Sequence, residues 1–225
     1  MTNKEEIPER YSRQQDIVSE ERLAECKATV VGVGAIGRQV ALQLAAMGIP
    51  WLQLLDFDSV EISNLASQGY LEEDLGMPKV DATAALCWRI NPNLEIQKVN
   101  DRFRRSMEIG NVLFNAVDSI ETRRLIWNVV KDKMDYYADG RMTAEVLRVL
   151  SVSDLASQEY YPGTLFTASE AYAGPCTAKT TIYCANIAAG LMVVQFTKWL
   201  RRLSVDSDIQ VNLLSMEMNL LQGGD

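Results

Sequence analysis

The chain has 225 residues, a formal net charge of −8 and no histidine. Its length suits one domain with one core, and its 48% hydrophobic content is that of an ordinary globular protein. The negative charge makes nucleic acid an unexpected partner, and the lack of histidine excludes Ser-His-Asp catalysis, Cys-His catalysis and His-ligated metals.

The apolar runs are too short for a membrane span. The candidate at 187–196 is interrupted by Gly190 and Gln195, whereas a spanning helix needs about 20 apolar residues. The first ten residues are polar and charged and lack the apolar core of a signal peptide. The four cysteines form no C-x-x-C pair, so a zinc site of the usual spacing is not expected. We expect a cytoplasmic protein with no membrane segment.

Short apolar runs, typical of buried strands, alternate along the chain with segments of helical spacing. In chain order we expect strand 28–33, helix 34–47, strand 52–57, helix 78–90, strand 94–99, strand 112–117, helix 120–133, strands 136–138 and 146–152, helix 182–203 and strand 209–215. Residues 157–180 are rich in Gly, Pro, Ser and Thr and are expected to form a long mobile loop. The pattern predicts an α/β, Rossmann-like fold with a mostly parallel sheet, helices on both faces and antiparallel strands at the C-terminal end.

A glycine loop follows the first expected strand and opens the first expected helix. Gly32, Gly34 and Gly37 form the pattern G-x-G-x-x-G. Glycines let the backbone approach phosphates, and the helix N-terminus offers free N–H groups and a positive dipole end. Asp56 ends the next strand, where an acid can accept hydrogen bonds from ribose hydroxyls. These features predict an adenine-nucleotide site without separating NAD from ATP.

The segment after Asp56 carries a family resemblance. It reads D-x-D-x-V, then S-N-L-x-x-Q, then G-x-x-K, and contains Asp58, Asn64, Gln68 and Lys79. The run resembles the ThiF-type adenylyltransferases, the superfamily of ubiquitin-activating enzymes and of the activators of thiamine and molybdopterin sulfur carriers. Further matches, which extend the resemblance over roughly 10–203, are R-Y-S-R-Q at 10–14, N-P at 91–92, Asp118 and Arg123.

The resemblance implies ATP and Mg²⁺ as cofactors. It implies that Asp56 holds the ribose, that Asn64, Gln68 and Lys79 surround the phosphates, and that Asp118 binds Mg²⁺. Arg13 would reach the phosphates of a neighbouring subunit, which implies a homodimer. Taken singly, each residue also has an ordinary structural reading, such as a helix cap for Asp118 or a solvated surface position for Lys79.

The implied reaction is adenylation of the C-terminal glycine carboxylate of a ubiquitin-like or sulfur-carrier protein that ends in Gly-Gly. A carboxylate is already ionised at pH 7, so this attack needs no general base and suits a chain without histidine. Cys176 lies in a P-x-C-T-x-K segment similar to that of ubiquitin-activating enzymes, in which the cysteine takes the carrier as a thioester. A conjugating enzyme is then a further partner to consider. Cys184 matches a second, non-catalytic cysteine of the family, and Cys26 and Cys87 are expected in the core.

Two alternatives stay open. Ser67 stands where the family pattern N-L-x-R-Q has arginine, which favours a non-catalytic subunit of a heterodimeric activating enzyme. An NAD-dependent oxidoreductase would share the glycine loop and Asp56 but does not predict the segment that follows. We expect one adenylation domain over 1–225, with Cys176 in the loop at 157–180.

Overall fold

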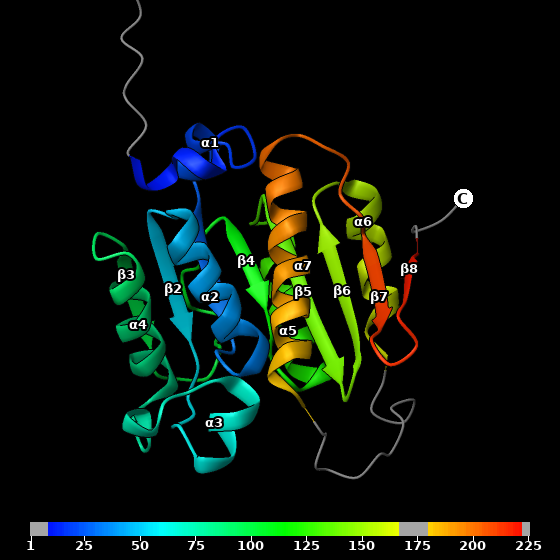
Figure 1. Cartoon of the computed structure of the whole chain (residues 1–225). Coiled ribbons are helices and arrows are strands. Elements are labelled where there is room, and N and C mark those ends of the chain that lie inside the picture. The colour runs from blue at the N-terminus through cyan, green and yellow to red at the C-terminus, as the bar shows by residue number, and fades with distance from the viewer. Residues whose placement is uncertain (1–8, 167–179, 222–225) are drawn as a thin grey trace, which may run out of the picture.

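The computed structural model describes residues 9–166 and 180–221. Its centre is an eight-stranded sheet with the order β3-β2-β1-β4-β5-β6-β7-β8, parallel from β3 to β5 and antiparallel from β5 to β8 (Figure 1). The strands are β1 (Lys27–Val31), β2 (Trp51–Leu55), β3 (Glu95–Val99), β4 (Val112–Asn115), β5 (Tyr136–Thr143), β6 (Val146–Val152), β7 (Asp208–Asn212) and β8 (Glu217–Leu220). The expected α/β fold with antiparallel strands at its C-terminal end is confirmed.

Helices cover both faces of the sheet. They are η1 (Glu9–Gln14), α1 (Glu20–Ala24), α2 (Ala35–Met47), α3 (Ile62–Gln68), η2 (Glu72–Asp74), α4 (Lys79–Ile90), α5 (Ile120–Val130), α6 (Leu155–Tyr160), η3 (Tyr161–Thr164) and α7 (Ile182–Leu200). Figure 1 shows α2, α4 and α7 on one face and α5 and α6 on the other. Within the described residues, no helix has the length and apolar character needed to cross a membrane.

The strands contribute alternate residues to two cores. Val30 and Phe114 pack with α2 and α7 on one face, whereas Val31 and Leu113 pack with α5 on the other. Successive side chains of a strand point to opposite faces, so a strand buried on both faces is apolar throughout. This explains the uninterrupted apolar runs of β1 and β4.

The prediction of a loop at 157–180 is wrong for residues 157–164. Residues 157–164 belong to α6 and η3. Asp154 caps α6 by accepting the backbone N–H of Ser157 at 2.8 Å, and Pro162 lies in the first turn of η3. Serine, aspartate and proline favour helix starts as much as loops, because they satisfy or remove the free N–H groups there. Residues 167–179, which include Cys176, lie outside the described residues.

Other elements also differ from expectation. Strand β5 continues past Ala138 to Thr143, because its second half pairs with β6 across a tight turn. The last expected strand, at 209–215, is β7 and ends earlier, at Asn212, and β8 (Glu217–Leu220) was not expected. Helix α3 was not expected, and it forms because Glu61 and Asn64 make a capping box at its start.

Candidate active site

The candidate site lies at the carboxyl ends of β1, β2 and β4, the lower edge of the sheet in Figure 1, beside α3. Strand β1 lies between β2 and β4, so the chain leaves β1 and β2 toward one side of the sheet and β4 toward the other. Ligands of open α/β sheets bind in the crevice that such a change of direction creates. The loops that follow these three strands carry the glycines, Asp56 and Asp58, and Asp118.

The glycine loop packs too closely for side chains at two of its positions. Gly32 has a φ of +83°, and a Cβ there would lie 2.9 Å from the carbonyl oxygen of Ala116. A Cβ on Gly37 would lie 1.8 Å from the carbonyl oxygen of Gly32. Gly34 precedes α2 and has no side chain to cap it. The first-turn N–H groups of α2 can therefore bind an anion.

Gly37→Ala is expected to destabilise the protein by about 1–3 kcal/mol or more, because the added methyl group overlaps a backbone oxygen. It should also weaken ATP binding, since the loop must shift to accommodate the methyl group. Thermal unfolding and calorimetric titration with ATP measure the two effects. Gly190→Ala, in the open on α7, is the control and should leave ATP binding intact. An unchanged melting temperature for Gly37→Ala would contradict the packing described here.

Asp56 joins the glycine loop to the loop after β2. Its Oδ2 accepts the N–H of Val33 at 2.8 Å, and its Oδ1 accepts the N–H of Asp58 at 2.9 Å. Burial raises the pKa of Asp56, while these two hydrogen bonds and the charge of Lys79 oppose the shift. The carboxylate is thus fixed at the end of β2, where the glycine pattern predicts an acid.

Lys79 is buried beside the loop after β2 and is not a solvated lysine. It is only 6% exposed, and its Nζ lies 3.1 Å from Oδ2 of Asp58. Its backbone N–H donates to the carbonyl of Asp58 at 2.9 Å. A lysine is rarely buried unless it is paired, so the start of α4 is tied to the loop after β2. The structure therefore brings Lys79, Asp58 and Asp56 together.

Helix α3 presents one side chain to the glycine loop. Gln68 is half-buried, and its Oε1 lies 3.7 Å from the position of a Cβ on Gly34. Asn64 uses its Oδ1 to accept the N–H of Glu61 at 3.0 Å, and Ser67 donates its hydroxyl to the carbonyl of Ser63 at 2.9 Å. Of the residues predicted on this helix, only Gln68 is shown against the loop.

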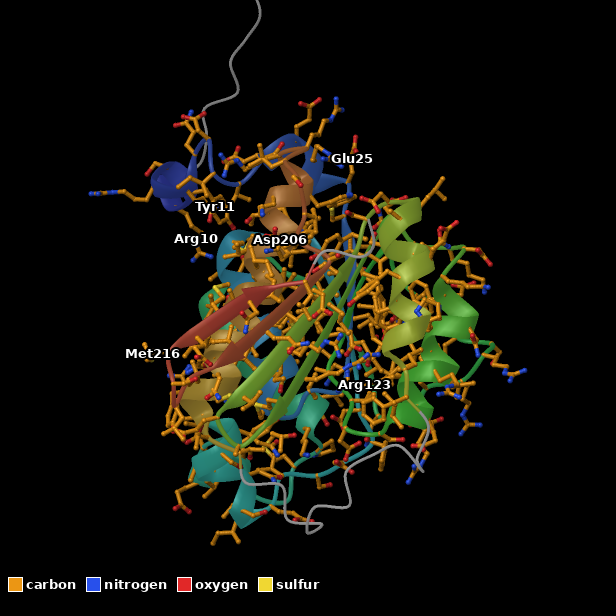
Figure 2. All side chains as sticks on the ribbon, turned by 90° about the vertical axis from the view of Figure 1, so that its right-hand side faces the viewer. Arg10, Tyr11, Glu25, Arg123, Asp206 and Met216 are labelled. Atoms are coloured by element: carbon orange, nitrogen blue, oxygen red, sulfur yellow. The ribbon has the colours of Figure 1, made fainter. Side chains whose placement is uncertain are left out.

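Asp118 follows β4 and is exposed. The backbone before it is held by Arg123, a buried side chain of α5 (Figure 2), which donates to the carbonyls of Val117 and Gly140 and pairs with Asp139. Burial is the main reason that the pKa of Arg123 falls to about 10. The described residues contain no group of three or more metal-ligating side chains. A single carboxylate such as Asp118 is enough to suit Mg²⁺, which commonly binds through one or two carboxylates and substrate phosphates.

Arg13 lies at the opposite edge of the molecule. Its helix, η1, packs against the far ends of α2 and α4: Gln14 donates to the carbonyl of Met47 at 2.7 Å, and Arg10 donates to that of Ile90 at 3.0 Å. Figure 2 shows Arg10 at this end of the molecule. Helix α2 has 13 residues, so about 20 Å separate η1 from the glycine loop. Arg13 cannot reach the site of its own chain.

The three cysteines that the structure describes are buried. Burial raises the pKa of Cys26 and of Cys87 to about 12 and also raises the pKa of Cys184. A thiol with a raised pKa and no exposure is a poor nucleophile. The expectation that Cys26 and Cys87 are core residues is confirmed.

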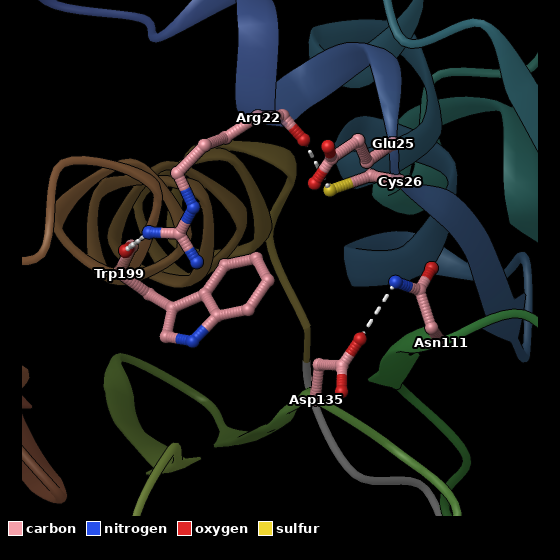
Figure 3. A pocket seen from close by; sticks show the side chains of 6 residues that line it. All are labelled: Arg22, Glu25, Cys26, Asn111, Asp135 and Trp199. Atoms are coloured by element: carbon pink, nitrogen blue, oxygen red, sulfur yellow. Dashed lines mark hydrogen bonds between the residues drawn. The ribbon is translucent and has the colours of Figure 1, made fainter.

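A cavity of about 280 Å³ lies away from the site, where β1, β4 and β5 begin (Figure 3). Its lining residues are Arg22, Glu25, Cys26, Asn111, Asp135 and Trp199. Asn111 donates to Asp135 at 2.8 Å, and Arg22 donates to the carbonyl of Trp199 and lies over its ring. Arg22, Asn111 and Asp135 therefore have hydrogen-bond partners, and the thiol beside them is un-ionised at neutral pH.

One residue beside the glycine loop escaped the sequence analysis. Arg38 follows Gly37 on α2, is only 2% exposed, and lies 4.5 Å above the ring centre of Tyr70. Tyr70 in turn donates its hydroxyl to the carbonyl of Val33 at 2.6 Å. The sequence signal that could have revealed this residue is a charged side chain within the otherwise apolar stripe of α2.

Known proteins resemble this chain in sequence and in fold. The model of the ThiF family matches residues 11–221. Molybdopterin-synthase adenylyltransferase of Haemophilus influenzae is 31% identical over 134 residues, 55% of this chain and 54% of that protein. SAMP-activating enzyme E1 of Haloferax volcanii is 34% identical over 134 residues, 55% of this chain and 50% of that protein. The chain thus spans about half the length of these curated relatives.

Among solved structures, the crystal structure of E. coli MccB with ATP has the same fold. Its TM-score is 0.70 at 17% sequence identity, over 91% of this chain and 66% of that chain. At this identity the likeness concerns the fold alone.

Proposed function

This chain belongs to the ThiF family, and on that premise we propose that it adenylates the C-terminal glycine carboxylate of a ubiquitin-like or sulfur-carrier protein with ATP. The names of the relatives from H. influenzae and H. volcanii describe an adenylyltransferase and an activating enzyme. A carrier that ends in Gly-Gly is the proposed substrate, and a conjugating enzyme is a further candidate partner.

The observation that carries the proposal is the placement of Lys79. A buried lysine at 3.1 Å from Asp58, beside the glycine loop, puts a fixed cation where a polyphosphate would lie. The free N–H groups at the start of α2 add a second positive region. Asp56, at the end of β2, is the proposed ribose ligand. An oxidoreductase that binds a dinucleotide has no need for this cation.

In the proposed reaction, an oxygen of the carrier's terminal carboxylate attacks the α-phosphorus of ATP. The bond from that phosphorus to the bridging oxygen breaks, and pyrophosphate leaves with the electron pair. Lys79, Gln68, Asn64 and the start of α2 hold the phosphates, and no proton has to be removed. Asp118 would hold Mg²⁺, which would supply positive charge against the leaving pyrophosphate.

Arg13 supports a homodimer with shared sites. Because η1 lies about 20 Å from the glycine loop of its own chain, the exposed side chain of Arg13 can serve the reaction only in a second copy. A two-fold dimer places the same surface of each subunit in contact, so both sites would be completed together. The proposed active unit is therefore a dimer of adenylation domains.

ATP–pyrophosphate exchange tests the proposal. Wild-type protein with ATP, Mg²⁺, labelled pyrophosphate and a candidate Gly-Gly carrier should form labelled ATP, and a carrier without its last two glycines should not support exchange. Binding of ATP without exchange with any Gly-Gly carrier would instead favour the non-catalytic subunit. Reduction of NAD without ATP binding would overturn the proposal.

Cys176→Ala is expected to abolish a thioester with the carrier while leaving pyrophosphate exchange unchanged, because adenylation involves no sulfur. In the second step a thiolate would attack the carbonyl carbon of the acyl adenylate, and AMP would leave. Non-reducing gels with and without dithiothreitol detect the adduct. Cys184→Ala is the control and should retain the adduct, since Cys184 is buried. An adduct that persists in Cys176→Ala would show that Cys176 is not the acceptor.

A further inference from the structure

Arg38 is a buried cation beside the glycine loop, and two of its three guanidinium nitrogens lack hydrogen-bond acceptors among the described residues. It is 2% exposed, and its Nε and Nη2 have no partner among the described residues. Burial lowers the pKa of Arg38, and the charge of Asp74 partly opposes this shift, although Oδ2 of Asp74 accepts the N–H of Leu71. The ring of Tyr70 below the guanidinium orients it but accepts no conventional hydrogen bond.

This arrangement is costly unless something else completes it. Arginine stays charged at neutral pH, and a buried charge without partners opposes folding. Buried polar groups are nearly always hydrogen-bonded in native proteins, and exceptions cluster at functional sites or at sites of unseen ligands. Arg38 therefore requires either a ligand or a change of partners when a ligand binds.

Gln68 has a buried hydrogen-bond acceptor that lacks a donor in the described part of the chain. Its Oε1 is buried and has no hydrogen-bond partner among the described residues, and it lies beside Gly34. Nη1 of Arg38 lies 3.6 Å from the position of a Cβ on Gly69, the residue that follows Gln68. Side chains on a helix lean toward its N-terminus, so Arg38 covers the turn that begins at Gly34. An unpaired donor group and an unpaired acceptor thus lie against the same turn of α2.

We propose that Arg38 is a positioning residue of the nucleotide site, which acts on the phosphates through Gln68. When a triphosphate binds, the Arg38 guanidinium donates to Oε1 of Gln68, and the Nε2 group of Gln68 is thereby turned toward a phosphate oxygen. The inference rests on the adenylation function proposed above and assigns a new residue to it.

The positive charge of Arg38 stabilises the proposed arrangement. A hydrogen bond from a guanidinium is stronger than one between neutral groups, and low local polarity strengthens it further. The polyphosphate also supplies negative charge near a cation whose Nε and Nη2 have no hydrogen-bond acceptor in the described part of the chain. Ser67, on the neighbouring helix α3, supplies no positive charge of its own, and its hydroxyl already donates to the carbonyl of Ser63. The effect of Arg38 should therefore be larger for ATP than for AMP.

Calorimetric titration with ATP and with AMP tests the inference on wild type, Arg38→Met, Gln68→Met and the double variant. Each single substitution should weaken ATP binding about tenfold, as expected for loss of a charge-assisted hydrogen bond, and should change AMP binding much less. The double variant should bind ATP no worse than either single variant, because both remove the same interaction. Arg38→Lys should recover part of the affinity.

Stability separates this role from a structural one. Without nucleotide, Arg38→Met should melt at the same temperature as wild type or higher, because this removes a buried charge with two nitrogens that are unpartnered in the described part of the chain. Arg148→Met is the control for a structural arginine, since Arg148 pairs with the fully buried Asp208 at 2.5 Å. It should melt at a lower temperature and bind ATP normally.

Several outcomes would overturn the inference. Arg38→Met could melt lower and bind ATP as wild type does, which is the behaviour of a structural arginine. The losses in the double variant could add, which would show that Arg38 does not act through Gln68. If wild type binds no ATP and shows no exchange, the proposed function fails as well. If wild type shows exchange but Arg38→Met binds ATP normally, only the present inference fails.

Discussion

Asp118→Ala is expected to lower Mg²⁺-dependent ATP–pyrophosphate exchange by about 100-fold or more, because the proposed metal ligand is lost at the point where charge develops. The backbone around position 118 is held by Arg123 through the carbonyl of Val117, so removal of the exposed carboxylate leaves the loop in place. Substitution of an exposed residue of this kind changes stability by only about 0.5 kcal/mol. Thermal unfolding should therefore match wild type.

The controls distinguish loss of metal from loss of charge in general. Asp132→Ala removes another exposed carboxylate beyond the far end of α5 and should retain full exchange. Raising the Mg²⁺ concentration should partly restore exchange by Asp118→Asn, which keeps one oxygen ligand. Wild-type exchange by Asp118→Ala would remove Asp118 from the site and leave the proposed Mg²⁺ ligand unassigned.

Arg13→Ala is expected to lower exchange by about 100-fold or more, since a single arginine that contacts transferring phosphates can carry that factor or more. Its loss should be repaired in trans. In a mixed dimer of Arg13→Ala and Asp118→Ala subunits, one site holds Asp118 from the first subunit and Arg13 of the partner subunit. An equal mixture, allowed to exchange subunits, should regain about a quarter of wild-type activity if dimers form at random.

Each variant alone should remain inactive, and light scattering at micromolar concentration should give the mass of a dimer. Arg201→Ala, an exposed arginine after α7, is the control for loss of surface charge and should be active without mixing. A mixture that stays inactive although both variants dimerise would show that Arg13 does not act across the dimer. A monomeric mass for wild type would contradict the homodimer itself.

Much of the fold could be predicted because the relevant signals are local. The apolar runs of β1, β2 and β4 and the helical spacing of α2 depend on residues close together in the chain. The glycine loop and Asp56 were placed correctly because a strand end, a tight turn and a helix start occur within a single βαβ unit. Short elements were missed, since capping residues such as Asn64 and Ser157 also occur in turns.

The sequence by itself determined the fold class, the glycine loop and the position of Asp56, which bonds to that loop, because backbone conformation there is set by residue types at fixed spacing. Only the tertiary structure decided which charged groups are buried and what they face. Lys79 is paired with Asp58, and Arg13 lies at the opposite edge from the loop. Nη1 of Arg38 lies beside Gly69, and its Nε and Nη2 have no hydrogen-bond acceptor among the described residues. Burial and pairing arise from contacts between segments far apart in the chain, so composition and periodicity do not reveal them.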